Sequence, residues 1–153
     1  MKGQKAKRIL FVDDDPRVLN GLRRNLDDMR DQWEMHFSSS GQEALEMLTQ
    51  PSLPDLIVCD IMMPGLDGFG ILKNVRENPA TAMIPFIFLT GRAEKLNMRK
   101  GMEGGADDYL TKPFSAPEII AAINTRLKKK ANLDQHSEKK LDELRQNIIY
   151  RMP

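Results

Sequence analysis

The sequence has one cysteine, two histidines and no long apolar run, and each scarcity excludes a class of protein. A lone cysteine, Cys59, cannot form an internal disulfide or supply a cysteine-based zinc site. His36 and His136 lie far apart and lack the spacing of metal ligands. No apolar stretch is long enough to span a bilayer, and the apolar run after the basic N-terminus is too short for a signal peptide. We therefore expect a cytoplasmic protein without a membrane partner.

Excess charge is also absent. The 153 residues carry a formal net charge of +1, so nothing in the overall electrostatics favours nucleic acid as a partner. Hydrophobic residues make up 41% and charged residues 29% of the chain, which is typical of a globular protein rather than a disordered one. The length predicts one domain of ordinary size with a short appendage.

Five segments have the composition of short strands, and a helical pattern follows each of them. This alternation predicts a parallel sheet with helices on both faces. Right-handed connections then bring the carboxyl ends of all strands to one edge of the sheet. The second strand alternates apolar with polar residues, as a strand near a sheet edge does. The predicted strands are 9–12, 33–37, 56–59, 84–89 and 108–111, and the predicted helices begin near Pro16, Gly41, Phe69, Ala93 and Pro117.

Polar side chains end four of these strands. Asp13 and Asp14 follow the first strand, Asp60 the third, Thr90 the fourth and Lys112 the fifth. Three carboxylates in one cleft stay ionised only with a compensating cation. All-oxygen ligands select a hard divalent ion, here Mg²⁺, with Mn²⁺ as a possible substitute. The sequence therefore predicts a metal site at the edge of the sheet.

The same edge carries the groups that phosphoryl transfer requires. Lys112 offers a positive charge and Thr90 a hydroxyl for phosphoryl oxygens. Asp60 ends the central apolar strand, so its carboxylate is the candidate nucleophile. A phosphoryl-transfer site with an aspartate nucleophile follows from this combination.

Together these motifs resemble the receiver domains of two-component response regulators. The resemblance covers about residues 8–130 and implies a flavodoxin-like (βα)5 fold. It implies five parallel strands in the order 2-1-3-4-5, with helices on both faces and the last helix extended toward the C-terminus. The segments that carry it are 12–16, 55–60, 63–65 with 67–68, 89–90 and 109–114.

The resemblance also implies a role for each residue of the site. Asp60 accepts a phosphoryl group from the phosphohistidine of a histidine kinase or phosphotransfer protein. Asp13, Asp14 and Asp60 bind Mg²⁺ together with the backbone carbonyl of Met62. Thr90 and Lys112 assist the transfer, while Asp15 caps the first helix and the Lys112–Pro113 peptide is cis. An isolated domain of this kind catalyses only its own phosphorylation and dephosphorylation.

Two further pairs of positions receive roles from the resemblance. Thr90 and Tyr109 form the switch that alters the surface of the fourth helix, fifth strand and fifth helix. Met62 and Arg92 flank the path of the water that would attack the phosphoryl group. Neither side chain can act as a general base, so we expect slow self-dephosphorylation.

Residues 131–153 lie outside the receiver pattern and continue its last helix as a linker. Leu141, Leu144 and Ile148 fit a heptad register, but Lys130, Asp134 and Ser137 interrupt the seam. Two interpretations remain: a solvated helical extension, or a coiled coil that makes a homodimer. The segment 141–153 also resembles the chain just before the phospho-accepting histidine of histidine kinases. This similarity suggests the N-terminal receiver of a hybrid histidine kinase, cut before its kinase core.

Two alternatives to a receiver follow from the same residues. A Mg²⁺-dependent phosphatase with an aspartyl-phosphate intermediate places a second acid two residues after the nucleophile, where this chain has Met62. A dimerising interaction module with a silent site predicts the loss of a residue such as Asp13 or Lys112, and both are present.

Overall fold

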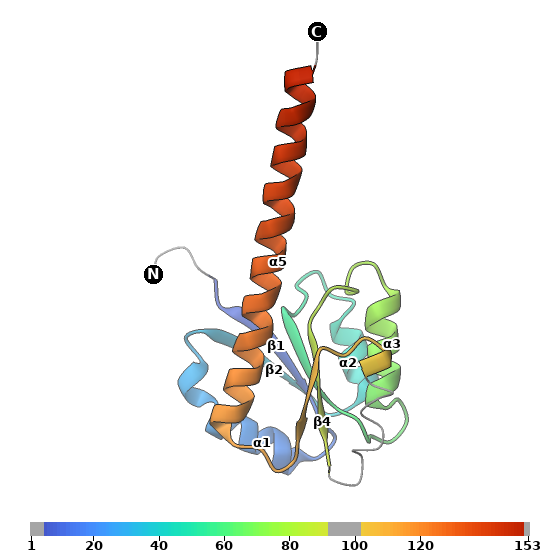
Figure 1. Cartoon of the computed structure of the whole chain (residues 1–153). Coiled ribbons are helices and arrows are strands. Elements are labelled where there is room, and N and C mark those ends of the chain that lie inside the picture. The colour runs from blue at the N-terminus through green and yellow to red at the C-terminus, as the bar shows by residue number, and fades with distance from the viewer. Residues whose placement is uncertain (1–4, 92–101, 152–153) are drawn as a thin grey trace.

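The computed structural model describes residues 5–91 and 102–151, and a five-stranded parallel sheet forms its centre (Figure 1). The strand order is β2-β1-β3-β4-β5, so the predicted order and the predicted position of the second strand at an edge are confirmed. All neighbouring strands pair in parallel. The strands are β1 (Lys7–Val12), β2 (Trp33–Ser38), β3 (Leu56–Asp60), β4 (Phe86–Thr90) and β5 (Asp108–Thr111).

Helices cover both faces of this sheet, as predicted. Leu19 of α1 and Ile123 of α5 belong to the core on one face, whereas Ala44 of α2 and Ile71 of α3 belong to the core on the other. β3 and β4 are buried along their whole length, which explains their nearly continuous apolar sequences. The helices are α1 (Pro16–Asn25), the short 3-10 helix η1 (Asp27–Met29), α2 (Gly41–Met47), α3 (Gly68–Glu77) and α5 (Ala116–Arg151).

Side-chain caps explain where the helices begin. Asp15 caps α1 by accepting a hydrogen bond from the Arg17 backbone N–H at 2.9 Å, with Pro16 at the first helical position. Ser40 and Asp67 cap α2 and α3 in the same way. The caps of α1 and α2 lie two or three residues after a strand end, so these helices start close to the edge of the sheet that carries the polar residues, whereas the loop 61–67 separates β3 from α3.

Several predicted boundaries were wrong by one or two residues, and the starts of β4 and α5 show a physical cause. β4 begins at Phe86 rather than at residue 84, because Pro85 has no N–H to donate to the neighbouring strand. α5 begins at Ala116 rather than at Pro117. The Ser115 hydroxyl accepts from the Glu118 backbone N–H and the Glu118 carboxylate accepts from that of Ser115, both at 3.2 Å, which is a capping box.

α5 is a single helix of 36 residues that rises well beyond the sheet (Figure 1). Side chains 131–148 are all exposed, whereas Ile119 and Ile123 near its start are buried. The predicted C-terminal extension is thus confirmed. Nowhere in residues 5–91 and 102–151 does a helix combine the length and apolar character needed to cross a membrane. Most of the predicted weak helix 93–104 lies outside the described residues.

Candidate functional site

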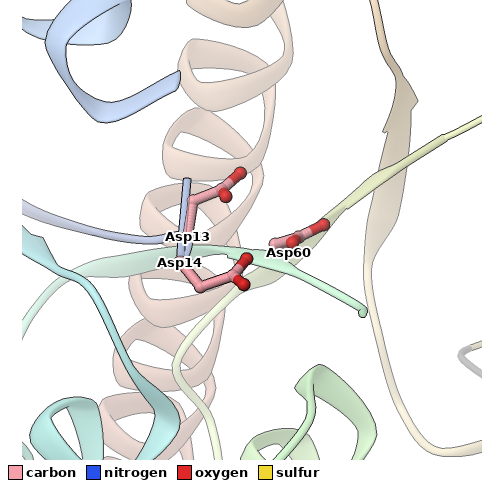
Figure 2. Close-up of side chains that lie close together, drawn as sticks. All are labelled: Asp13, Asp14 and Asp60. Carbon is pink, nitrogen blue, oxygen red and sulfur yellow. The ribbon is translucent and has the colours of Figure 1, made fainter. Parts of the chain in front are cut away.

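Three carboxylates meet at the carboxyl edge of the sheet (Figure 2). Val12 of β1 pairs with Cys59 of β3, so Asp13 and Asp60 follow at the ends of adjacent strands. One oxygen from each of Asp13, Asp14 and Asp60 lies within 4.8 Å of the others. Asp13 is completely buried and Asp60 is 5% exposed, while Asp14 is exposed to solvent. The predicted convergence of these three side chains is therefore present.

The ammonium group of Lys112 contacts two of these carboxylates. Its Nζ donates to Asp13 Oδ2 at 2.9 Å and to Asp60 Oδ1 at 3.2 Å. Burial lowers the pKa of Lys112, but the hydrogen bond that it donates to Asp13 and the charges of Asp60 and Asp13 outweigh this effect, so that its pKa lies above the ordinary value. Lys112 follows β5, and its peptide bond with Pro113 is cis. A charged lysine thus links the first, third and fifth strands.

The donor set fits a hard divalent cation. Among the described residues, the Lys112 ammonium pairs with two of the three carboxylates, and all the ligand atoms that the cluster offers are oxygens. Asp13 is already oriented, because its Oδ1 accepts from the Asp15 backbone N–H at 2.9 Å. Asp14 reaches the solvent, which leaves room for the waters that Mg²⁺ retains.

Thr90 and Tyr109 lie on the neighbouring strands β4 and β5. Thr90 is completely buried at the end of β4, and its hydroxyl donates to the Gly91 carbonyl at 3.0 Å. The Lys112 backbone N–H donates to the Thr90 carbonyl at 2.7 Å, which ties the two strand ends together. Tyr109 is partly buried and packs against the core beneath α2 and α3. These contacts place the predicted switch residues on one side of the carboxylate cluster.

Of the two positions predicted to affect the phosphoryl lifetime, the structure describes Met62 but not Arg92. The Met62 side chain is 59% exposed in the loop after β3, two residues from Asp60. Arg92 lies outside the described residues.

Cys59, predicted to be a core residue, is completely buried, and burial together with the charge of Asp60 raises the pKa of its thiol well above the ordinary value.

Sequence reasoning missed the part that Ser38 plays. Residues 38–41 read as a loop, but Ser38 is the last residue of β2 and is completely buried. Its carbonyl accepts a hydrogen bond from the Asp13 backbone N–H at 3.1 Å, and its hydroxyl donates to the Ser40 carbonyl at 2.9 Å. The sequence did contain one signal for this role. Ser38 directly follows the predicted strand 33–37, so it lies at the carboxyl edge of the sheet together with the other polar residues.

Comparison with known proteins identifies this arrangement. Residues 9–124 match the family model of the response regulator receiver domain. The chain is 38% identical over 143 residues to the alkaline phosphatase synthesis transcriptional regulatory protein PhoP of Bacillus subtilis, a match that covers 94% of this chain and 58% of the relative. It spans about half the length of the curated relatives it matches.

Solved structures give the same result. A putative response regulator from Chloroflexus aurantiacus superimposes with a TM-score of 0.74 at 36% identity, covering 80% of this chain and 98% of that one. An adenylate cyclase structure from Rhodopirellula baltica matches with a TM-score of 0.74 at 32% identity, covering 90% of this chain and 98% of that one. With its 2-1-3-4-5 sheet and its carboxylate cluster at the carboxyl edge, the chain belongs to the response regulator receiver domain family.

Proposed function

We propose that Asp60 accepts a phosphoryl group from a phosphohistidine of a histidine kinase or phosphotransfer protein, in a Mg²⁺-dependent reaction that regulates a fused or separate output. The observation that carries this proposal is the position of Lys112 Nζ, in contact with both Asp13 and Asp60. A structural ion pair needs one carboxylate, whereas this lysine faces a cluster of three. Three carboxylates this close together are suited to a cation and to the phosphoryl group that the cation attracts.

The residues around Asp60 supply the chemical groups that the phosphoryl transfer needs. A carboxylate oxygen of Asp60 forms the new bond to phosphorus as the bond to the imidazole nitrogen of the donor breaks, and the imidazole keeps the electron pair. Asp13, Asp14, Asp60 and the Met62 carbonyl would hold Mg²⁺, which when bound would supply positive charge for the phosphoryl oxygens. Lys112 donates to a second phosphoryl oxygen. Asp13 stays in place while charge moves, because its carboxylate accepts from the Asp15 N–H and its own N–H donates to the Ser38 carbonyl.

Thr90 and Tyr109 are proposed to transmit the phosphorylation of Asp60 to the surface of the fourth helix, fifth strand and fifth helix. The Thr90 hydroxyl turns from the Gly91 carbonyl toward the phosphoryl group, and Tyr109 moves inward behind it. The half-buried position of Tyr109 against the core supports this role, because a fully packed ring has no second position to occupy. The phosphoryl group then shifts the population toward the active arrangement of this surface.

Phosphoryl acceptance is tested with acetyl phosphate as the donor. We expect one phosphate adduct per chain by intact mass in the presence of Mg²⁺, none in EDTA and none in Asp60→Asn. Asp28→Asn, an exposed aspartate away from the cluster, is the matched control and retains the adduct. Continuous release of phosphate from added monoesters supports a phosphatase instead, and a complete lack of adduct supports a silent interaction module.

The adduct should be long-lived. Met62 offers no proton acceptor to the attacking water, so we expect self-dephosphorylation to be slower than minutes in Mg²⁺. Met62→Asn places an amide at the same exposed position and should shorten the lifetime. The measurement is the decay of the adduct mass after removal of acetyl phosphate. Loss within minutes from the wild-type chain contradicts the proposal.

Residues 1–130 are proposed to form the receiver and residues 131–153 a helical linker toward an output. The support is the change of environment along α5, whose described side chains are all exposed from residue 131 to residue 148. Leu141, Leu144 and Ile148 are 52%, 52% and 62% exposed and follow one another at helical spacing. We propose that this stripe makes a weak parallel contact with a second copy of the chain, because the polar seam residues before it confine the contact to the last turns.

A further inference from the structure

The loop 61–67 between β3 and α3 connects Asp60 to the helix behind the site. Its first residue is held on both sides: the Ile61 N–H donates to the Leu89 carbonyl at 3.3 Å, and the Ile61 carbonyl accepts from the Gly68 N–H at 2.8 Å. Met62, whose carbonyl is a proposed metal ligand, follows directly. The position of the loop therefore decides where one metal ligand lies.

Two glycines lie very close to this stretch of backbone: Gly41, the first residue of α2, and Gly68, the first residue of α3. A Cβ atom on Gly68 would lie 2.9 Å from Ile61 Cα and still closer to the Asp60 carbonyl oxygen. A Cβ atom on Gly41 would lie 2.9 Å from Leu66 Cβ and closer still to the Leu66 carbonyl oxygen. Such separations are well inside van der Waals contact, which for two carbons is about 3.5–4.0 Å. Either side chain would force the backbone of the loop or of Asp60 to move.

Space, and not backbone conformation, is the reason for glycine at both positions. Neither Gly41 nor Gly68 has a positive φ, so an alanine at either position meets no conformational penalty from its own backbone. Both residues are buried. The atoms they face are mostly main-chain atoms, which cannot rotate away as a flexible side chain does. The helices α2 and α3 therefore hold the loop between them at fixed distances.

We propose that Gly41 and Gly68 are positioning residues for the metal and acceptor site, an inference that rests on the function proposed above. Gly68 acts on the backbone of Asp60 and Ile61, and Gly41 acts through Leu66 at the far end of the loop. Together they set the path of the chain from Asp60 to α3. A methyl group at Gly41 displaces the loop while leaving Asp60 at the end of β3 and Asp13 and Asp14 directly after β1.

The test measures Mg²⁺ binding separately from labelling, by which we mean the phosphorylation of Asp60 by acetyl phosphate. Mg²⁺ affinity is measured by titrating MgCl₂ into the unphosphorylated chain and following amide chemical shifts, and labelling by intact mass with acetyl phosphate. We expect Gly41→Ala to raise the Mg²⁺ dissociation constant at least fivefold, while labelling at saturating Mg²⁺ stays within twofold of wild type. Gly68→Ala should weaken Mg²⁺ binding and also slow labelling at saturating Mg²⁺, because the backbone of Asp60 itself has to move.

Three controls keep the result specific. Gly21→Ala in α1 adds the same methyl group where nothing lies within 4 Å, and should leave Mg²⁺ binding unchanged. Leu26→Ala removes a completely buried side chain from the opposite face of the sheet, so it lowers the melting temperature without touching the loop. Should Gly41→Ala fail to fold, Leu66→Ala releases the loop from the other side without any clash and should raise the dissociation constant at least threefold.

The outcomes that would overturn the positioning role of the glycines differ from those that would overturn the proposed function. A folded Gly41→Ala chain with wild-type Mg²⁺ affinity overturns the proposal, as does an equal loss of affinity in Leu26→Ala. An unchanged affinity in Leu66→Ala overturns it when Gly41→Ala is unfolded. If the wild-type chain neither binds Mg²⁺ nor takes up phosphate, the proposed function itself fails, and this is seen before any variant is compared.

Discussion

At the scale of single residues, Lys112 has the largest effect on the charge balance of the site. Its ammonium group lies against two carboxylates that are almost completely buried, so its removal leaves the three acids facing one another. We expect Lys112→Met to lower the free energy of unfolding in EDTA by about 1–3 kcal/mol, the range for buried groups that lose a charged partner. Millimolar Mg²⁺ should restore much of this loss, because a cation then replaces the ammonium group.

Urea unfolding with and without Mg²⁺ measures both effects. Lys130→Met is the matched control: its ammonium donates at 2.9 Å to Asp134, whose side chain is 58% exposed, and an ion pair with an exposed carboxylate contributes little. Equal stability of the wild type and Lys112→Met in EDTA would show that the lysine does not offset the repulsion among the acids.

At the scale of elements, Arg76 ties the end of α3 to the segments that precede β4 and β5. Its guanidinium donates to the carbonyls of Ala82, Ile84 and Gly105 and to the Asp107 carboxylate, at 2.6–3.1 Å. The same carboxylate accepts from the Phe86 backbone N–H at 2.8 Å. Burial lowers the pKa of Arg76, and the neighbouring Asp107 opposes this shift. One side chain thus fixes how both strands enter the sheet.

Replacing Arg76 tests this link between elements. We expect Arg76→Met to cost about 2–4 kcal/mol of unfolding free energy, because several partly buried acceptors lose their donor together. Lys73→Met on the same helix is the control, since its pair with Glu77 is exposed and 3.9 Å long and should contribute less than about 1 kcal/mol. Chemical denaturation of the two variants gives the comparison, and similar losses from both would argue against a structural tie at Arg76.

At the scale of the whole molecule, the receiver and the exposed part of α5 are expected to behave differently. The core clusters on both faces of the sheet involve residues up to Leu127, whereas the exposed Leu141, Leu144 and Ile148 have no partner within the described chain. Most of the stability of helices in proteins comes from packing of an apolar face, so a second copy would stabilise this part of α5.

Sedimentation distinguishes the two interpretations of this helix. We expect residues 1–153 to associate with rising concentration, and both residues 1–130 and the full chain with Leu144→Glu to remain monomeric. Leu26→Ala, whose side chain is buried far from the stripe, should associate as the wild type does. A wild-type chain that stays monomeric at every concentration supports the solvated extension instead.

Much of the architecture could be predicted before the structure, because its signals are local. Apolar runs of strand length, caps such as Asp15 and Ser40, and apolar residues at helical spacing are read within a few positions of each other. Parallel strands bring their carboxyl ends together by a general rule, which was enough to predict that Asp13, Asp14 and Asp60 meet. Boundaries such as the start of β4 depend on a single missing N–H and were less accurate.

Local patterns in the chain were thus enough to predict the alternating elements and the chemical types present at the sheet edge, and the family resemblance supplied the sheet order. Which atoms touch became clear from the folded chain alone: Lys112 against both Asp13 and Asp60, Arg76 across two loops, and Gly41 against Leu66. The physical reason is distance along the chain. Contacts between residues separated by tens of positions depend on how whole elements pack, to within fractions of an ångström, and no local pattern contains that information.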